Sequence, residues 1–481
     1  MLSSESLFLI TIAIGFIGAL SPLILSYSYK EKSYFGVLTA LSSAYLFVQI
    51  ILLSMLAFKV INVGYSLILG GKILLDGFAA IPSVFIAFIA LVVLLAYASM
   101  ADDLERYSIF TSVLFLGELG SILISESSSI SMFLSSWILI VISSYIAIAS
   151  EKSKLSSDAA LKYSLMGVVS TAFIVLWLGS GIYFGGDEIY GGVYPLTSKL
   201  AMIAIVMLTA GIGFKLGIFP FQWWMVDVYS FADGKSVSLI TGVIKVGVIF
   251  AFTRMLYYTF YLSPSSVALL MISILSILTM TFGNFAAFTS KVFPRILAYS
   301  SIAQIGYIMV GMVGLLNGAI TGNQTLVLFS SAAIAVQGLS YALSKSLSFL
   351  VSGRYGSMVE LSQLKGLYRR DPVVAFSIIV AMLNLLGLPP LLGFWGKVYL
   401  FQAGLTYSIW LVVIAIINSG ISSFYYGRII AEIFSSSEQQ GEDMKLKAMR
   451  TYVIVLAILL IVLGLGLIQA MFSYMGIHYL Y

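Results

Sequence analysis

The chain has 481 residues, of which 60% are hydrophobic and only 9% are charged. A soluble domain carries roughly 25% charged residues, so this composition excludes a soluble protein and indicates one that crosses a membrane many times. The formal net charge of +5 does not indicate a nucleic-acid partner, because the basic residues are spread between apolar segments.

The residue types that are scarce exclude further classes of function. The sequence contains no cysteine, which excludes disulfides and thiol chemistry. Its single histidine, His478, argues against His-based metal binding and catalysis. The sequence also lacks a glycine-rich nucleotide motif after a predicted strand. We therefore expect no catalytic residue, no metal site and no cofactor bound by this chain.

The apolar segments, taken in chain order, predict an all-α polytopic membrane protein. A transmembrane helix needs about 20 mostly apolar residues, and segments of that length indicate about fourteen helices. The run 372–404 is long enough for two half-helices with a break. The segment 60–78 alternates and contains Gly70–Gly71, which predicts a short hairpin outside the bilayer. The predicted helices are 6–28, 34–57, 79–99, 108–125, 129–149, 161–186, 199–219, 236–260, 264–289, 295–316, 325–351, 372–404, 408–433 and 450–474.

The basic residues between these segments predict an orientation. With the N-terminus outside, most of the 25 lysines and arginines fall in inner loops or at the adjoining helix ends. Inner loops of membrane proteins carry an excess of such residues. The pattern predicts a multi-pass membrane protein with its N-terminus and its C-terminus outside. We expect the membrane to be that of a prokaryotic cell.

Four lysines fall inside predicted helices and away from the ends that adjoin the loops: Lys215, Lys245, Lys345 and Lys397. Each costs roughly 2.5–3.5 kcal/mol at a helix centre on insertion scales, unless its side chain snorkels to the interface. Removal from water disfavours the charged form of a lysine and a nearby carboxylate restores it, so a buried lysine can load and release a proton. Our hypothesis is a proton relay across the bilayer midplane. Glu118 is the only carboxylate well inside an early span, and we predict a role for it.

Two of the predicted helices combine a buried lysine with a proline break. Lys215 is followed by Pro220, and Pro389–Pro390 are followed by Lys397. Interrupted helices at corresponding places in two halves indicate inverted repeats with a site at the midplane. We therefore predict two inverted five-helix repeats with broken helices 7 and 12. The predicted units are three N-terminal helices with the hairpin in 1–107, the repeats in 108–260 and 264–433, and a C-terminal helix in 434–481.

Six stretches carry a resemblance to a known family. The chain resembles the antiporter-like membrane subunits of respiratory complex I, a family shared with Mrp-type antiporters and membrane-bound hydrogenases, and its DVY (227–229) and FYYGRII (424–430) favour the N-type subunit. The stretches are SDAALKYSLMG (157–167), GFKLGIFPFQWWMVDVY (213–229), GVIKVG (242–247), RILAYSSIAQIGY (295–307), LGLPPLLGFWGKVYLF (386–401) and INSGISSFYYGRII (417–430).

The resemblance implies roles for individual lysines. Lys215 matches the lysine of the seventh helix that pairs with a glutamate on the fifth helix, and Lys245 matches the connecting lysine on the eighth. Lys397 matches the terminal lysine on the broken twelfth helix. Lys162 matches a lysine at the start of the sixth helix, and Lys345 is similar to the lysine of the L, M and Mrp types.

The implied function is proton translocation in a complex I-like NADH (or other donor):quinone oxidoreductase. The implied partners are other membrane subunits, the lipid bilayer and protons, with sodium as the alternative ion and with no nucleic acid. Two other functions stay open: a subunit of a Mrp-type sodium/proton antiporter, and a structural membrane subunit that does not conduct.

The sequence departs from the family at the partner of Lys215. The fifth-helix glutamate should stand seven residues before Tyr145, where this chain has Ile138. Our hypothesis is that Glu118 replaces it and lies within bridging-water reach of Lys215. Three positions where the family has histidine are also changed, namely Gln222, Gln304 and Tyr341.

Overall fold

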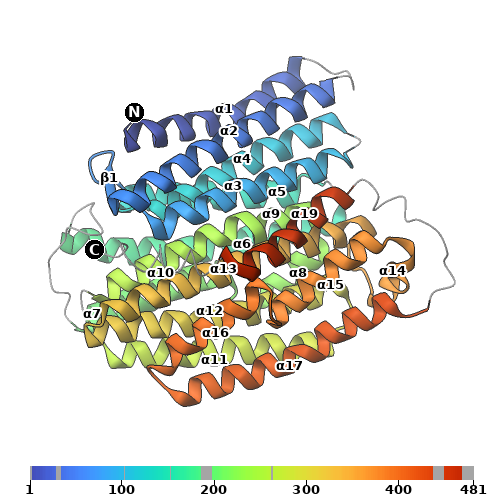
Figure 1. Cartoon of the computed structure of the whole chain (residues 1–481). Helices are drawn as coiled ribbons and strands as arrows, with labels where there is room; N and C mark the ends of the chain where they lie inside the picture. The colour runs from blue at the N-terminus through green and yellow to red at the C-terminus, as the bar shows by residue number, and fades with distance from the viewer. Residues whose placement is uncertain are drawn as a thin grey trace.

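The computed structural model describes residues 3–28, 34–101, 103–151, 153–185, 198–261, 264–436 and 449–467. Within these ranges the chain is helical apart from one hairpin, and the long helices lie side by side (Figure 1). Twelve of the described helices are long and apolar enough to cross a membrane, and two apolar segments, 372–386 and 450–466, are shorter. The prediction of an all-α polytopic membrane protein is confirmed. The inverted orientation of two repeats, the unit boundaries and the side on which each terminus lies stay predictions.

The first half of the chain forms helices α1 to α7 and one antiparallel hairpin. Their bounds are α1 Ser4–Ser28, α2 Tyr34–Val63, β1 Tyr65–Ile68, β2 Ile73–Asp76, α3 Gly77–Ala98, α4 Leu104–Glu126, α5 Ile130–Ala149, α6 Lys154–Gly185 and α7 Ser198–Leu216.

The second half contains both helix breaks. Its elements are α8 Trp223–Phe231, α9 Gly234–Leu239, the π-helical turn η1 Ile240–Ile244, α10 Lys245–Tyr261, α11 Ser266–Thr289, α12 Phe293–Thr321, α13 Gln324–Tyr355, the 3₁₀ turn η2 Leu361–Leu364, α14 Leu367–Arg370, α15 Pro372–Leu386, α16 Leu392–Leu405, α17 Ile409–Phe434, α19 Arg450–Val462 and the π-helical turn η3 Leu463–Leu467.

The predicted bounds need three corrections. The hairpin is shorter than 60–78, because α2 continues to Val63 and α3 begins at Gly77. The seventh predicted helix, 199–219, ends earlier, at Leu216, and a separate short helix, α8, follows the break. The sixth begins earlier, at Lys154. The last part of the predicted helix 450–474, residues 468–474, lies outside the described residues.

The hairpin and the helix starts have local causes in the sequence. Tyr65 pairs with Asp76 and Ile68 with Ile73, and the turn between the strands uses Gly70 and Gly71 at positive φ, which glycine adopts without strain. Asp76 then ends the strand and caps α3, since its carboxylate accepts the backbone N–H of Ala79 at 3.0 Å. Ser129, Ser265, Asn323 and Asp371 cap later helices in the same way.

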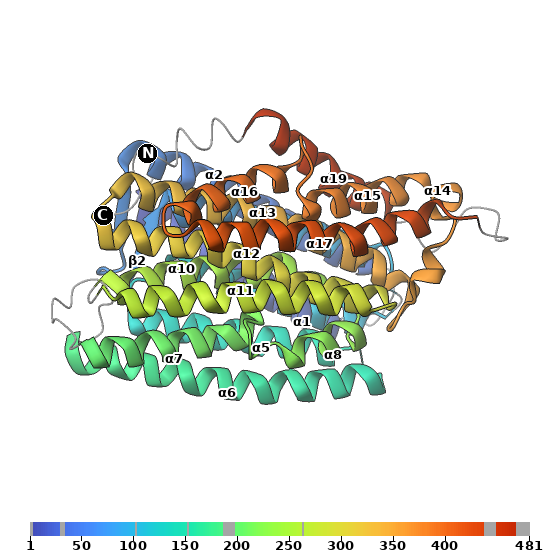
Figure 2. The ribbon, with the colours of Figure 1, turned by 90° about the horizontal axis from the view of Figure 1, so that it is seen from below.

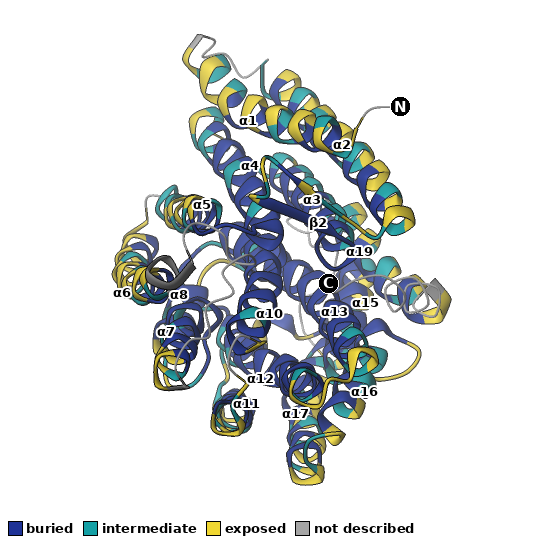
Figure 3. Ribbon diagram, turned by 90° about the vertical axis from the view of Figure 1, so that its left-hand side faces the viewer, coloured by how far each residue is buried: buried dark blue, intermediate teal, exposed yellow. Residues whose placement is uncertain are grey.

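The core of the molecule is a layer of helices that are buried over most of their length. Figure 3 shows α10, α12 and α13 buried at the centre, with exposed residues concentrated on the outer helices. The most apolar part of 234–261 is wholly buried, whereas that of α2 is only 33% buried. The exposed faces of α1, α2, α6 and α17 carry large apolar side chains, which suits contact with lipid or with other membrane proteins. Of the buried lysines, Lys245 and Lys345 lie on α10 and α13 of this layer, and Lys215 and Lys397 lie on the adjoining helices α7 and α16.

Candidate functional site

Lys215 lies in the last turn of α7, directly before the first helix break. Its side chain is 5% exposed, and its Nζ donates a hydrogen bond to Ser144 Oγ of α5 at 2.9 Å. The same Nζ lies 4.7 Å from the ring centroid of Tyr163 on α6. After Lys215 the chain turns at Gly217, which has positive φ, and Phe219–Pro220 is a cis peptide bond. The break leaves the carbonyl of Leu216 without a helical partner.

Lys245 binds that free carbonyl. Its Nζ donates to Leu216 O at 3.1 Å and lies 3.3 Å from Met225 Sδ, and the residue is fully buried. The π-helical turn η1 ends immediately before Lys245, and such single-turn irregularities often accompany functional sites. The C-terminal end of a helix carries negative partial charge, so the end of α7 suits a cation.

The second break repeats this arrangement with Lys397. Its Nζ donates to the carbonyl of Leu386, the last residue of α15, at 2.9 Å, and to Ser419 Oγ of α17 at 2.9 Å. The turn again begins at a glycine with positive φ, Gly387, and Pro389–Pro390 is cis. Lys397 Nζ also lies 4.7 Å from the ring centroid of Tyr307. The three prolines predicted to break helices therefore all lie in such breaks.

The four buried lysines form a row, because α7 packs on α10, α10 on α13 and α13 on α16. Lys345 lies on α13, between Lys245 and Lys397 in this row. Its Nζ donates to the carbonyl of Leu297 at 2.7 Å and to the hydroxyl of Ser300, both on α12. The residue is fully buried. Since all four lysines are at most 5% exposed and their amines bond inside the protein, the snorkelling alternative is wrong.

Polar side chains connect the middle of the row to the second break. Gln337 donates to Gln304 at 2.8 Å, and Gln304 donates to the carbonyl of Leu385 at 2.9 Å and to the Tyr426 hydroxyl at 3.4 Å. Asn384 donates to Ser340 Oγ and Ser344 Oγ, at 2.7 and 2.8 Å. The sequence analysis names Gln304, as a position where the family has histidine, but it misses Gln337, Asn384, Ser144 and Ser419. Only Asn384 carried a local signal, because it stands just before Gly387.

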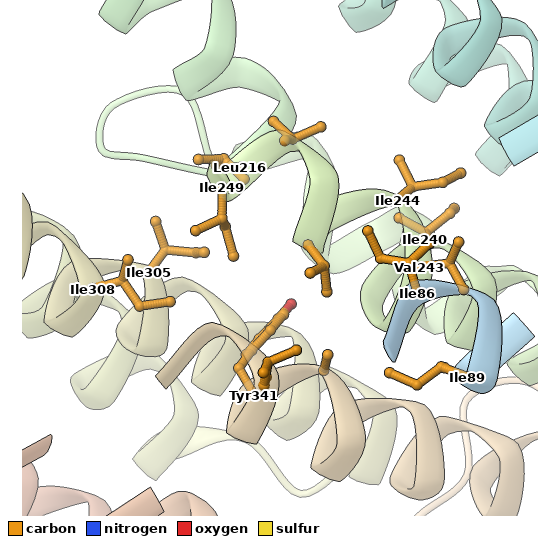
Figure 4. Close-up of a cluster of buried hydrophobic side chains, with 14 of the residues drawn as sticks. Ile86, Ile89, Leu216, Ile240, Val243, Ile244, Ile249, Ile305, Ile308 and Tyr341 are labelled. Carbon is orange, nitrogen blue, oxygen red and sulfur yellow. The ribbon is translucent and has the colours of Figure 1, made fainter. Parts of the chain in front are cut away.

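An apolar shell surrounds this polar row. Figure 4 shows side chains of α3, η1, α10, α12 and α13 around Tyr341, including Ile249 and Ile305. The Tyr341 ring lies 5.9 Å from Lys245 Nζ, and its hydroxyl has no hydrogen-bond partner among the described residues. The shell keeps bulk water away, so the lysine amines are bonded by carbonyls, hydroxyls and, for Lys245, the thioether of Met225.

Glu118 lies inside the protein but does not contact Lys215. It is fully buried on α4, and its hydrogen-bond partner is Gln49 Nε2 of α2 at 3.5 Å. The other carboxylate oxygen of Glu118 has no partner among the described residues. A side chain facing lipid would have excluded our hypothesis. A water-bridged approach to Lys215 stays a prediction.

Lys162 differs from the four central lysines. Its Nζ lies 2.6 Å from Asp227 Oδ2, and the two side chains are 47% and 38% exposed. This pair joins α6 to α8 at the periphery. In contrast, no carboxylate of the described residues lies within ion-pair distance of Lys215, Lys245, Lys345 or Lys397.

Helix α5 contains no acidic residue that could pair with Lys215, and Ile138 stands where the family has its glutamate. Ile138 is 43% exposed on the outer face of α5.

No group of three or more His, Cys, Asp or Glu that could hold a metal ion occurs in the described ranges. The groups that surround the buried amines are serine hydroxyls, backbone carbonyls and aromatic rings.

The fold and the site define a class: a polytopic helical membrane protein with two broken helices and a lateral row of buried lysines. The chain belongs to the family described as NADH:quinone oxidoreductase/Mrp antiporter membrane subunits, whose profile matches residues 127–422. The family resemblance stated from the motifs is confirmed.

Two curated relatives illustrate the match. NADH-quinone oxidoreductase subunit 14 of Thermus thermophilus is 33% identical over 312 residues, which cover 64% of this chain and 66% of the relative. The chain thus spans about two thirds of that protein's length. NADH-quinone oxidoreductase subunit N of Dehalococcoides mccartyi is 28% identical over 382 residues, covering 76% of this chain and 78% of the relative.

Solved structures share the fold over nearly the whole chain. A chain of respiratory complex I from Thermus thermophilus with bound aureothin matches with a TM-score of 0.78 and 26% identity, covering 96% of this chain and 99% of that one. A chain of the archaeal membrane-bound sulfane sulfur reductase gives a TM-score of 0.82 at 21% identity, covering 97% and 96%. A chain of the Mrp complex from a Dietzia species gives 0.81 at 17% identity, also covering 97% and 96%. The last two likenesses concern the fold alone.

Proposed function

We propose that this chain is a proton-translocating membrane subunit of a complex I-like NADH (or other donor):quinone oxidoreductase. Protons move along Lys215, Lys245, Lys345 and Lys397. The observation that carries the proposal is that all four amines are buried, bound by neutral oxygens and without a carboxylate in ion-pair contact. The names of the two curated relatives support the assignment to such an oxidoreductase.

The mechanism follows from the cost of burying charge. Burial of a lysine amine in an apolar site without a counter-ion disfavours its charged form, so an amine that takes up a proton there readily passes it on. When one lysine takes a proton, its charge disfavours a second charge on the next lysine, so protons advance one site at a time. The carbonyls of Leu216 and Leu386 stabilise the charged amines of Lys245 and Lys397.

In this proposal the redox cofactors lie in other subunits, since this chain has no cysteine for iron–sulfur clusters. The chain sits in a prokaryotic cell membrane with both termini outside, next to other membrane subunits. The likeness to a Mrp chain does not by itself favour sodium as the ion, because it concerns the fold alone.

The test is Lys245→Met in the intact complex, reconstituted into proteoliposomes. Methionine keeps most of the volume and removes the amine. We expect proton translocation per electron to fall about tenfold or more, as for loss of a proton-transfer group, while the intrinsic electron-transfer activity of the redox subunits persists. Lys199→Met, at the exposed start of α7, is the matched control and should change nothing.

Three results would contradict the proposal. Unchanged pumping in Lys245→Met would favour a structural subunit that does not conduct. Purification of the chain with antiporter subunits alone, and a strict requirement for sodium, would both favour the Mrp-type alternative.

A further inference from the structure

Helices α1, α2 and α4 meet at a buried polar contact that the lysine row does not include. Glu118 of α4 and Gln49 of α2 are both fully buried. Gln49 Nε2 donates to Glu118 Oε2 at 3.5 Å and to the backbone carbonyl of Thr11 on α1 at 3.2 Å. The first distance is at the limit for a hydrogen bond. One residue from each of three helices thus contributes to one contact inside the protein.

Two oxygens at this contact lack a hydrogen-bond partner among the described residues, namely Glu118 Oε1 and Gln49 Oε1. Buried polar atoms are nearly always satisfied, and a buried carboxylate also needs a positive charge beside it. No lysine or arginine of the described ranges forms an ion pair with Glu118, whose hydrogen-bond partner is the Gln49 amide. The contact therefore lacks both a cation and a ligand for its free oxygens.

Glycines of α1 allow the three helices to approach one another closely. A Cβ at Gly15 would lie 2.4 Å from Leu119 Cδ2 and 2.8 Å from Gln49 Nε2. Thr11 stands four residues before Gly15, which is about one helical turn, so the same approach brings the Thr11 carbonyl to the Gln49 amide. The sequence of α1 thus holds the polar contact together.

This contact lies on the side of α4 that faces away from the lysine row. Figure 3 shows α1 and α2 beyond α4, on the side opposite to α12 and α16. With another face α4 packs on α5 and α10, and a Cβ at Gly117 on that face would lie 3.3 Å from Ser143 Oγ. Glu118 therefore belongs to the contact with α1 and α2.

A rotation of the Gln49 amide converts the contact into a set of oxygens. After a rotation of about 180°, the amide oxygen faces Thr11 O and Glu118 Oε2 at the places where the NH₂ group now donates. Sodium has nearly the radius of calcium and takes oxygen ligands at about 2.3–2.6 Å, so ligands at right angles lie about 3.3–3.7 Å apart. The separations of 3.2 and 3.5 Å are close to this spacing.

Charge and ligand type determine which cation fits. Glu118 is the one acid of the contact, so a monovalent cation neutralises it, whereas a divalent cation would leave a net positive charge buried. Carboxylate and carbonyl oxygens are the ligands that hard cations prefer. The expectation of no metal site rested on the scarcity of cysteine and histidine, which sodium does not need.

We propose that Glu118, Gln49 and the Thr11 carbonyl form a sodium site that joins α1, α2 and α4. A sodium ion that enters the site displaces the proton of the Glu118 carboxyl, which leaves to water, so the net charge of the site does not change. This role differs from the partnership with Lys215 that the sequence analysis expects for Glu118. The inference goes beyond the proposed function and does not depend on it, because sodium bound here is not the translocated ion.

Carbodiimide labelling of the intact complex tests the site. Dicyclohexylcarbodiimide adds to a protonated carboxyl in apolar surroundings, and bound sodium prevents the reaction because it removes that proton. Labelling of Glu118 is followed by mass spectrometry in sodium chloride and in choline chloride, at one pH and one ionic strength. We expect a saturable decrease in the labelling rate, of about tenfold at ten times the half-saturating sodium concentration. Glu126, the other fully buried acid of α4, is the internal control and should react equally in both salts.

Equal labelling of Glu118 in the two salts would overturn the inference, because the carboxyl would then hold a proton only. The measurement does not involve proton pumping, so its failure leaves the proposed function as it stands.

Thermal unfolding of the intact complex in detergent is a second measurement, which decides the matter even where the reagent does not reach Glu118. A ligand that binds only the folded protein raises the unfolding temperature. We expect sodium chloride to raise it by about 2 °C or more over choline chloride, and Glu118→Gln to abolish this difference. Glu126→Gln is the matched control and should retain it. Equal unfolding temperatures in the two salts, or a sodium effect that persists in Glu118→Gln, would overturn the site.

Discussion

Two lysines of this protein are held in the same way, by the last carbonyl of a broken helix. Lys245 binds Leu216 O at the end of α7, and Lys397 binds Leu386 O at the end of α15. The last carbonyls of any helix lack helical partners, and inside a membrane protein such groups must be satisfied from within. The break and the lysine therefore compensate for one another, because the carbonyl gains a donor and the amine gains an acceptor.

Unlike the lysines, which bind neutral carbonyls, Arg254 forms a buried ion pair with the carboxylate of Asp76. Arg254 Nη2 lies 2.7 Å from Asp76 Oδ1, and the two side chains are 1% and 5% exposed. Asp76 also caps α3. Removing one partner of a buried pair costs about 3–5 kcal/mol where the remaining charge has no other counter-charge, and Asp76→Ala also removes the cap of α3. We therefore predict that Asp76→Ala strongly lowers the thermal unfolding temperature of the purified complex in detergent.

The peripheral pair of Lys162 and Asp227 is the control for this prediction. Both side chains are more than a third exposed, and such pairs contribute about 0–1 kcal/mol. Asp227→Ala should leave the unfolding temperature nearly unchanged. Equal shifts for the two variants would show that burial does not determine the strength of the Asp76 contact.

At the scale of elements, the long helices and the helix breaks were predictable from the sequence, whereas the short irregular elements η1 and α8 were not. Apolar segments of sufficient length identify spans because the bilayer demands it, and Pro220 and Pro389–Pro390 mark breaks because proline lacks an N–H. The turn η1 was missed, since ITGVI has no residue that distinguishes a π-turn from an α-helix. The short helix α8 was missed because the chain resumes helical geometry only three residues after Pro220.

The candidate site was predictable to the same extent. The four lysines were identifiable singly, because charge inside an apolar run is costly. Their partners Ser144 and Ser419 were not, since serine in a membrane helix is usually a packing residue and only the tertiary structure brings it to an amine.

The second break gives a prediction for the packing of elements. Asn384 Oδ1 accepts the backbone N–H of Gly393 at 2.8 Å, which fixes the start of α16 against the end of α15. A Cβ at Gly393 would lie 2.0 Å from the backbone oxygen of Asn384, and a backbone atom cannot move aside cheaply. We predict that Gly393→Ala destabilises the protein by about 1–3 kcal/mol, as overpacking does, and lowers proton translocation.

The matched control for Gly393→Ala is Gly420→Ala in α17. A Cβ at Gly420 would meet nothing within 4 Å. Alanine in a helix interior is favoured over glycine by about 0.5–1 kcal/mol, so this variant should be at least as stable as the original protein. Thermal unfolding of both variants in detergent measures the difference, and a neutral Gly393→Ala would contradict the proposed rigidity of the break.

At the scale of the whole molecule, the lysine row crosses the helices instead of following one of them. α7 packs on α10, α10 on α13 and α13 on α16, and each of these four helices contributes one lysine (Figure 2). The outer helices α1, α2, α6 and α17 carry exposed apolar side chains on the outside of the molecule. Under the proposed function, a proton that moves along the row passes from helix to helix, and we expect the four lysines to act in series.

Serial arrangement makes a prediction about combined substitutions. If Lys245 and Lys397 act in one path, either Lys245→Met or Lys397→Met alone interrupts that path. The double variant should then translocate protons at about the same rate as the slower of the two single variants. Residues that act as a unit give such non-additive losses, whereas independent groups give losses that multiply. Proton uptake per electron in proteoliposomes of the intact complex measures all three variants. A double variant about tenfold slower than both single variants would mean that the two halves of the molecule conduct separately, each through its own broken helix.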